Sequence, residues 1–323
     1  MRQVRQIQQN RDFWLVALKI VVACLAFGFV AFSVFKYIDA GKQLKITDFK
    51  PFTFAVFLIL MPVNWFFESL KWQKLTENIE KLTIWQSTKS VLRGLAVSMI
   101  TPNRIGDFAG RVSVLKIGNR TTGAMSSLIG GYAQMLVIAV FAVLAFALKT
   151  KLPAQLHWAE SNYSLILIIL IILILIAIIL FFNLGKFSSK IEFRKCQLLQ
   201  NFIDGTKLYN SKQLFVVIGL SVLRYLVFSF QFYVALIAFG ADLELLAGLC
   251  AIAVMYGFVT IIPTFALAEW GVRGSVALFL FQPLGCSVVT IMATTIAVWL
   301  INVGLPAILG VYAIVLKNDK SDK

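Results

Sequence analysis

The stretch SLILIILIILILIAIILFF, Ser164 to Phe182, decides the class of fold to which this chain belongs. It holds no charged residue, no glycine and no proline over 19 positions. A helix that packs on the core of a soluble protein shows a polar stripe on its outer face, and this segment has none. About 20 apolar residues in a helix cross the roughly 30 Å hydrocarbon layer of a bilayer. The stretch therefore predicts a transmembrane helix.

Apolar runs of similar length recur on both sides of this stretch. Apolar residues make up 59% of the 323 positions and charged residues only 14%, well below the charged fraction of soluble domains. The sequence predicts spans at about 14–35, 52–70, 121–148, 162–183, 213–239, 244–263 and 285–315. In the last of these, Asn302, Gly304 and Pro306 predict a kink rather than two crossings.

Two further apolar segments, 91–112 and 264–283, are interrupted by proline or charge and are too short or too polar for ordinary spans. Such interrupted segments in corresponding halves of a chain point to a transporter's binding site. We expect an all-α polytopic membrane protein with about seven or eight transmembrane helices and two Pro-broken re-entrant segments. The chain, 1–323, would be a single integral membrane domain with halves 1–148 and 162–316, and an inverted repeat is one hypothesis for their relation.

The net charge of +15 lies in short loops between the apolar runs. No zinc finger or other nucleic-acid motif accompanies it, so we expect no nucleic-acid partner. Lys and Arg number three before the first span, nine from Lys71 to Arg120 and six from Lys186 to Lys212, against four, two and none in the alternate loops. Because cytoplasmic loops carry the excess of basic residues, this pattern predicts a cytoplasmic N-terminus.

Two segments share a spacing of acid and base that chance explains poorly. In TPNRIGDFAGRVSVLK, 101–116, Asp107 and Arg111 follow a proline, and in the later segment Glu269 and Arg273 do the same. The four-residue spacing puts each acid beside its base on a helix. A proline before the pair leaves backbone groups unpaired, which is tolerated at membrane depth only inside protein or beside water. Two interfacial turns with surface ion pairs explain the pattern about equally well.

Arg224 is deeper in its predicted span than a snorkelling side chain reaches. It follows Lys212 by twelve residues, or roughly 18 Å along a helix. An arginine at the centre of a span costs at least about 2.5–3.5 kcal/mol, so it needs an anionic partner. Asp107, Glu269 or a lipid phosphate could supply that charge, and Gln231 lies seven residues on, on the same face.

The segments on either side of residue 76 have more ordinary interpretations. NWFFESLKWQKL, 64–75, ends the second span with tryptophans and Lys71, which is typical of interfacial anchoring, although Glu68 could also face a cavity. TENIEKLTIWQSTKSVLR, 76–93, alternates polar and apolar residues at helical spacing. It predicts an amphipathic helix at the cytoplasmic interface.

No constellation of residues typical of catalysis appears. The chain lacks an HExxH motif, a Cys/His pair, a Walker loop and an aspartate run for Mg²⁺. Its one histidine lies in a loop and its four cysteines are scattered. We expect no enzymatic activity, no cofactor and no metal, while Asp107 and Glu269 stay open as an acid–base pair.

Three motifs resemble the lysylphosphatidylglycerol synthase transmembrane-region family: TPNRIGDFAGR, IIPTFALAEWGVRGSVAL and NWFFESLKW. That family includes the flippase-like membrane domains of bacterial multiple-peptide-resistance factors and their stand-alone relatives. In this likeness Gly106 and Asp107 match the usual Gly-Glu, Arg111 the following arginine, and Glu269 and Arg273 the charged positions of the second motif. The chain departs from the family where Pro-Gly-Gly is common, at Thr264, Phe265 and Ala266.

The resemblance implies a flippase that moves a lipid with a polar headgroup between leaflets of the bacterial cytoplasmic membrane. Its partners would be anionic or aminoacylated phospholipids. The substrate-binding residues would be basic ones for phosphate, acidic ones that balance them, and one amide, namely Arg104, Arg111, Arg224, Arg273, Asp107, Glu269 and Gln231. The aminoacyl-transferase domain of fused relatives is missing, which leaves room for a separately encoded lipid-modifying enzyme.

Three other functions stay open from the sequence. The chain could be an integral-membrane enzyme that acts on a lipid-linked substrate, a non-catalytic membrane partner of such an enzyme, or a carrier of ions or small solutes. A homo-oligomer is compatible with each of them.

Overall fold

The computed structural model describes residues 28, 31–33, 35, 48–99, 101, 105–116, 119–148, 162–187, 207–262 and 266–321, without the side chains of 184–187, 266–269 and 316–321. The predicted first span, 14–35, lies almost entirely outside these residues. Within them every regular element is a helix and there is no strand. The elements are α2 (Pro51–Thr76), α3 (Ile84–Met99), α4 (Gly106–Val112), α5 (Arg120–Ala147), α6 (Tyr163–Phe187), α8 (Ser211–Ala238), α9 (Leu245–Ile261), α10 (Ala266–Phe281), α11 (Val288–Trp299), a π-helical turn (Leu300–Gly304) and α12 (Leu305–Ser321).

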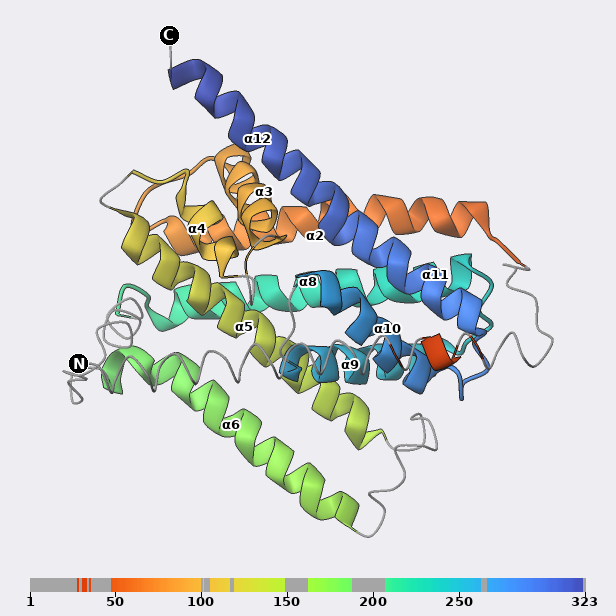
Figure 1. Ribbon diagram of the computed structural model, residues 1–323. Coiled ribbons are helices and arrows are strands. Elements are labelled where there is room, and N and C mark those ends of the chain that lie inside the picture. Colours follow the sequence, from red (N-terminus) through yellow and green to blue (C-terminus); the bar gives the residue numbers. More distant parts are fainter. Residues whose placement is uncertain are drawn as a thin grey trace, which may run out of the picture.

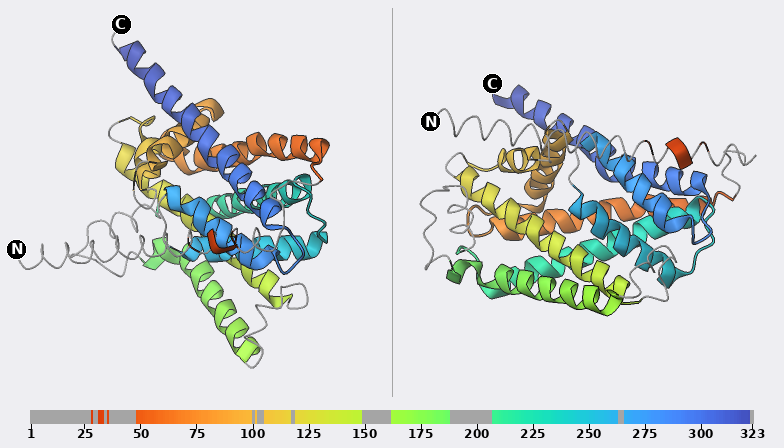
Figure 2. Two further views of the ribbon diagram at one scale, coloured as in Figure 1. Left: turned by 45° about the vertical axis from the view of Figure 1, so that its right-hand side comes forward. Right: turned by 60° about the horizontal axis from the view of Figure 1, so that its bottom comes forward.

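Five helices of the described residues are long and apolar enough to cross a membrane: 51–76, 120–147, 163–183, 211–238 and 288–315. Shorter apolar helices accompany them, so the all-α polytopic membrane fold is confirmed. In α6 only 6% of the most apolar window is buried, and Figure 2 shows this helix at the edge of the bundle. The stretch from Ser164 to Phe182 has no polar stripe because nearly all of its surface faces outward, where a bilayer would surround it.

An antiparallel pair of helices, α2 and α8, forms the centre of the bundle (Figure 1). The Lys50 N–H at the start of α2 donates to the Ala238 carbonyl at the end of α8, at 2.9 Å. At the other end, Asn78 Nδ2 donates to the Leu208 carbonyl at 2.6 Å. These contacts fix the two helices side by side along their whole length.

Each central helix is followed by a hairpin of two shorter helices. The α3–α4 hairpin follows the end of α2, and the α9–α10 hairpin follows the end of α8 (Figure 1). Thr290 at the start of α11 donates to the Phe239 carbonyl at 3.0 Å, so the second hairpin begins and ends at one end of the bundle. Because α2 and α8 are antiparallel, the two hairpins extend from opposite ends.

Two predicted boundaries differ from the structure. Residues 244–263 do not cross the bundle, because α9 ends at Ile261, just before Pro263, and pairs with α10. The predicted interfacial helix, 76–93, begins later than expected: Thr76 ends α2, 77–83 are a loop, and 84–93 continue into the first part of segment 91–112 as one helix, α3. Its polar residues Ser87, Ser90 and Arg93 are buried against neighbouring helices rather than exposed to water. Their alternation with apolar residues therefore does not mark a water-facing side of an interfacial helix.

The last span is continuous, as predicted. A π-helical turn at Leu300–Gly304 joins α11 to α12, so Asn302 and Gly304 distort the crossing without dividing it. α12 then packs along α3, where Arg93 Nη2 donates to the Ala313 carbonyl at 2.6 Å. The chain therefore leaves the bundle at the end where α3 begins.

The α3–α4 hairpin is tied to the loop before it at this same end. The Lys116 N–H and Asn119 Nδ2 donate to Glu80 at 3.0 and 3.1 Å. These hydrogen bonds, the backbone one first, lower the pKa of the Glu80 carboxyl below its usual range. The contact holds the connection between α4 and α5 against the loop between α2 and α3.

We predict that Gly310→Ala destabilises the bundle and that Gly131→Ala does not. A Cβ at Gly310 would overlap the Leu92 backbone carbonyl of α3, whereas a Cβ at Gly131 meets no atom within 4 Å. Overpacking of this kind costs about 1–3 kcal/mol. Thermal unfolding of the purified protein in detergent should show a lower Tm for Gly310→Ala only. Equal Tm values for the two variants would contradict this packing.

Candidate functional site

The carboxylate of Glu68, near the middle of the described bundle, contacts three cations. Glu68 lies on α2 and is 3% exposed. Its Oε1 is 2.7 Å from Arg111 Nη1 of α4, and its Oε2 is 2.8 Å from Lys71 Nζ and 2.7 Å from Arg224 Nη1 of α8. One carboxylate thus joins three helices by charge-assisted contacts, the strongest class of hydrogen bond and ion pair in proteins.

Asp107 adds a second carboxylate to this cluster. Its Oδ2 accepts from Arg111 Nε at 2.9 Å, the predicted ion pair four residues apart on α4. Two glycines allow α4 to approach α3 closely enough for this. A Cβ at Gly94 would overlap the Asp107 carboxylate, and one at Gly110 would overlap the Arg93 carbonyl. Close helix packing through small residues is common in membrane bundles.

Amide side chains surround Arg224 on its other sides. Arg224 Nε donates to Asn64 Oδ1 at 3.1 Å, and Nη1 lies 3.4 Å from Gln134 Oε1 of α5. Lys71 Nζ also approaches Gln134 Oε1, at 3.5 Å. Arg224 is the fourteenth residue of the 28-residue helix α8, so its charge lies at the middle of a span.

The polar contacts continue from Asn64 toward the start of α2. Asn64 Nδ2 donates to Asn302 Oδ1 at 3.4 Å, beside the π-helical turn, and Asn302 Nδ2 donates to Gln231 Oε1 at 2.8 Å. Gln231 Nε2 then donates to the Phe57 carbonyl at 3.1 Å. From Phe57 to Glu68 this polar chain covers about 16 Å along α2, roughly half the thickness of the hydrocarbon layer.

The charges in this cluster do not cancel. Two carboxylates, Glu68 and Asp107, face three cations, Lys71, Arg111 and Arg224. The side chains of Glu68 and Lys71 are 4% and 2% exposed, whereas those of Asp107 and Arg224 are 21% and 24% exposed. The residues that the structure describes here thus carry one surplus positive charge, and the cluster is accessible mainly at Asp107 and Arg224. We call these five residues the charged cluster.

A family model described as the lysylphosphatidylglycerol synthase TM region matches residues 14–310. The chain belongs to this family. The match covers the charged cluster and both hairpins, and it agrees with the family resemblance of the three sequence motifs. No curated protein matches the chain. Membership of the lysylphosphatidylglycerol synthase TM family associates the protein with membrane lipids.

The structure brings together four of the predicted site residues. Arg111 and Arg224 meet at Glu68, Asp107 pairs with Arg111, and Gln231 joins them through Asn302 and Asn64. Arg224 therefore has an anionic partner, as expected, but among the described residues that partner is Glu68 rather than Asp107 or Glu269.

The other three predicted residues are not joined to the charged cluster by any described contact. Arg273 of α10 is 8% exposed, with its guanidinium 5.8 Å from the centroid of the Tyr256 ring. Glu269 lies on α10, but its side chain is outside the described residues, as is Arg104 altogether. Their predicted roles stay predictions.

The interpretation of residues 64–75 as an interfacial anchor is wrong for its charged members. Glu68 and Lys71 are buried and pair with each other, at positions three apart on α2. Asn64, Glu68 and Lys71 lie at i, i+4 and i+7, which is one face of a helix. That spacing in the sequence indicates a polar face on α2. Gln134 carried no comparable signal, since it is a lone amide in an apolar helix.

We predict that Glu68→Gln lowers the free energy of unfolding by about 3–5 kcal/mol, because it leaves buried cations without their shared anion. The matched control is Glu77→Gln. That residue pairs with Lys74 at 3.3 Å, but both side chains are nearly half exposed, and an exposed pair contributes at most about 1 kcal/mol. Thermal unfolding in detergent gives the comparison.

A second substitution separates the ion pair from a general packing defect. Adding Arg224→Gln to Glu68→Gln removes a cation together with its anion, so the double variant should lose less stability than the sum of the two single variants. Strictly additive losses would show that the contact between Glu68 and Arg224 does not stabilise the bundle.

Proposed function

We propose that this protein translocates a lipid with a phosphate-bearing headgroup between the leaflets of the bacterial cytoplasmic membrane. The observation that carries the proposal is the surplus positive charge of the charged cluster at the middle of a membrane bundle. A buried charge without an anion is costly, and a phosphate group would neutralise it. The planar guanidinium of Arg224 suits a phosphate, and its side chain is the most accessible of the three cations.

The polar chain from Asp107 to Phe57 supports a route for a headgroup. Moving a charged headgroup through hydrocarbon alone would cost many kcal/mol. Amides at Asn64, Gln231 and Asn302 offer both donors and acceptors along about 16 Å of α2. In the proposed mechanism the headgroup exchanges contacts along this chain, while its acyl chains stay in the surrounding lipid.

The two hairpins supply the symmetry that such a mechanism needs. We interpret α3–α4 and α9–α10 as re-entrant elements, one from each face of the membrane, that alternately open the polar chain to either side. The acidic residues Asp107 and Glu269 would balance the bound phosphate and could hold the ammonium of an aminoacylated headgroup. The mechanism uses no covalent step, cofactor or metal.

The basic loops favour one orientation. Lys and Arg number nine from Lys71 to Arg120 and six from Lys186 to Lys212. Five of the nine, namely Lys74, Lys81, Lys89, Lys116 and Arg120, lie at the end of the bundle where α3 begins, which favours the cytoplasmic side for this end and for the N-terminus. A separately encoded lipid-modifying enzyme would then deliver its product from the cytoplasm. A homo-oligomer would be compatible with this arrangement.

We predict that Arg224→Gln slows lipid exchange between leaflets at least about tenfold, because a lost charge-assisted contact to phosphate is worth about 1.5–3 kcal/mol. The measurement uses proteoliposomes with phosphatidylglycerol labelled by a fluorescent acyl chain. Dithionite bleaches only the outer leaflet, so the slow phase reports exchange. Lys212→Gln, which removes an exposed cation from the same helix, is the matched control and should exchange normally.

Asp107→Asn tests the same site with less risk to the fold, since the Asp107 side chain is 21% exposed. It should also slow exchange, while thermal unfolding stays close to that of the unmodified protein. Normal exchange in both Arg224→Gln and Asp107→Asn would exclude the charged cluster as a translocation site.

A further inference from the structure

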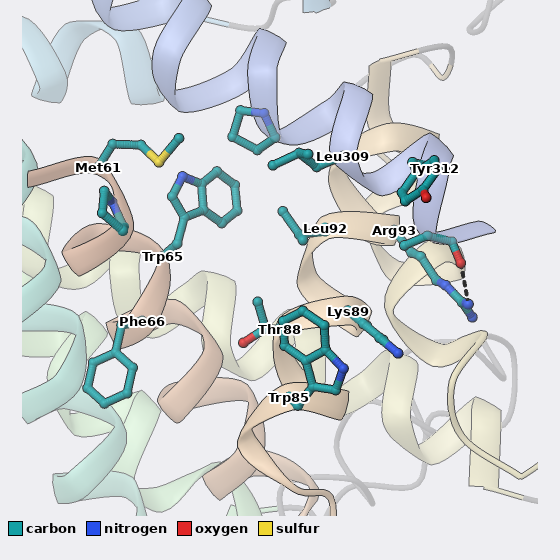
Figure 3. Close-up of a pocket in the computed structure, with 13 residues that line it drawn as sticks. Met61, Trp65, Phe66, Trp85, Thr88, Lys89, Leu92, Arg93, Leu309 and Tyr312 are labelled. Atoms are coloured by element: carbon teal, nitrogen blue, oxygen red, sulfur yellow. Dashed lines mark hydrogen bonds between the residues drawn. The ribbon is translucent and has the colours of Figure 1, made fainter. Parts of the chain in front are cut away.

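A lateral groove lies between α2, α3 and α12, outside the charged cluster (Figure 3). It has a volume of about 1020 Å³. Most of its lining is apolar, and Figure 3 shows Met61, Trp65, Leu92 and Leu309 around the space between the helices. A groove of this size on the outer part of a membrane bundle would hold something other than water.

One end of this groove is cationic. Lys89 and Trp85 line it on the first two turns of α3, with the Lys89 ammonium 5.1 Å from the centroid of the Trp85 ring. Trp85 is 63% exposed. Lys89 is five residues from the start of α3, about 8 Å along the helix, so its amino group reaches the membrane surface. A tryptophan and a lysine at this depth are typical of the headgroup region.

Two buried nitrogens behind the groove wall lack a hydrogen-bond partner among the described residues. Trp65 and Arg93 are 9% and 7% exposed, and Trp65 Nε1 and Arg93 Nε have no hydrogen-bond partner among the described residues. Both residues line the groove. Both nitrogens are themselves fully buried, so they lie behind the surface of the groove and do not face an occupant in this arrangement of the helices.

A second groove, of about 470 Å³, lies between α5, α8 and α9 and repeats the first. Four of the five lining residues of α3 have the same spacing as the four of α9: Trp85, Thr88, Lys89 and Leu92 against Leu246, Leu249, Cys250 and Ala253. The lining residues of α2 likewise match those of α8, each 164 positions apart: Met61, Pro62, Trp65 and Phe66 against Tyr225, Leu226, Ser229 and Phe230. Two corresponding pairs of helices, α2 with α3 and α8 with α9, thus line two related grooves of unequal volume.

The repetition also relates the two charged motifs and shows what is particular to the first groove. Asp107 and Arg111 precede Glu269 and Arg273 by 162 positions, close to the spacing that relates the grooves. The second groove has no charged residue in its lining, whereas the first has Lys89 and Arg93. Corresponding positions in the fold with unequal charge suggest ligands with a common apolar part and a headgroup selected by charge at one end only.

We propose that the groove between α2, α3 and α12 binds an anionic phospholipid from the leaflet at the end where α3 begins. The phosphate lies against Lys89, and one acyl chain follows Leu92 and Leu309 toward Met61. The proposal rests on the proposed lipid translocation and adds the class of lipid that binds. Its test measures binding without transport, so its failure can be distinguished from a failure of the proposed function.

The test uses the full chain in nanodiscs that contain a trace of phosphatidylglycerol with a diazirine in its acyl chain. After illumination, labelled peptides are located and counted by mass spectrometry. We expect labelling on the groove-facing parts of α2, α3 and α12. Phosphatidylcholine with the same acyl chains should label these positions about fivefold less, and Lys89→Gln should reduce labelling by phosphatidylglycerol to a similar degree, as expected for one cation near the surface.

Two matched pairs of variants separate the groove from general effects. Lys74→Gln removes an exposed cation that does not line the groove and should leave labelling unchanged. Leu309→Trp fills the groove and should abolish labelling, whereas its neighbour Ile308, 66% exposed and not part of the lining, tolerates the same change.

Three outcomes would overturn the proposal. Equal labelling by the two lipids would exclude selection of an anionic headgroup. Full labelling of Leu309→Trp would place the lipid elsewhere. Cross-links from the groove to a second copy of the chain, in place of lipid, would make it a protein interface.

Discussion

The ion pairs around Glu68 are the interaction on which the rest of the structure depends. Neither α2 nor α8 lies in a bilayer cheaply alone. Arg224 is at the middle of α8, and Glu68 and Lys71 are in the last third of α2. One centrally placed charge costs about 2.5–3.5 kcal/mol or more. Assembly of α2, α4 and α8 brings these charges together. Three features bring the charges into contact. The central helices are antiparallel, Gly94 and Gly110 let α4 approach α3 closely, and Gln134 lies beside Arg224.

The same ion pairs leave one positive charge of the cluster without an anion, and this surplus charge could bind an anionic ligand. A carboxylate has two oxygens, and those of Glu68 are already shared among three cations. A network with balanced charge would be more stable and would have no affinity for an anion. Stability is commonly lower at functional sites for this reason. The deep position of the surplus charge and its partial exposure at Arg224 favour a ligand that reaches it from within the membrane.

The sequence predicts some parts of this arrangement well, for physical reasons. The stretch from Ser164 to Phe182 is outward-facing, so its composition alone reveals its environment. Asp107 and Arg111 interact within one turn of helix, and local spacing is enough to pair them. The depth of Arg224 in its predicted span indicates a buried partner, because a charge at the centre of a span needs one.

The parts that were not predicted depend on which helix faces meet. A lone Asn64, Gln134 or Asn302 does not indicate its partner, since that partner is 63 or more positions away. α3 was divided wrongly because serines on a helix look the same in sequence whether they face water or a neighbouring helix. The regularity of the groove residues is visible only when the two lining sets are compared, because most of the matched side chains differ in type.

The unequal charge of the two related grooves has a kinetic consequence. For a translocator that consumes no energy, microscopic reversibility requires that binding at Lys89 change the rates of inward and outward passage by the same factor. The groove would then decide which lipids equilibrate quickly, and it could not enrich them in either leaflet. Any lasting difference in composition between the leaflets would have to come from synthesis on one face or from removal on the other.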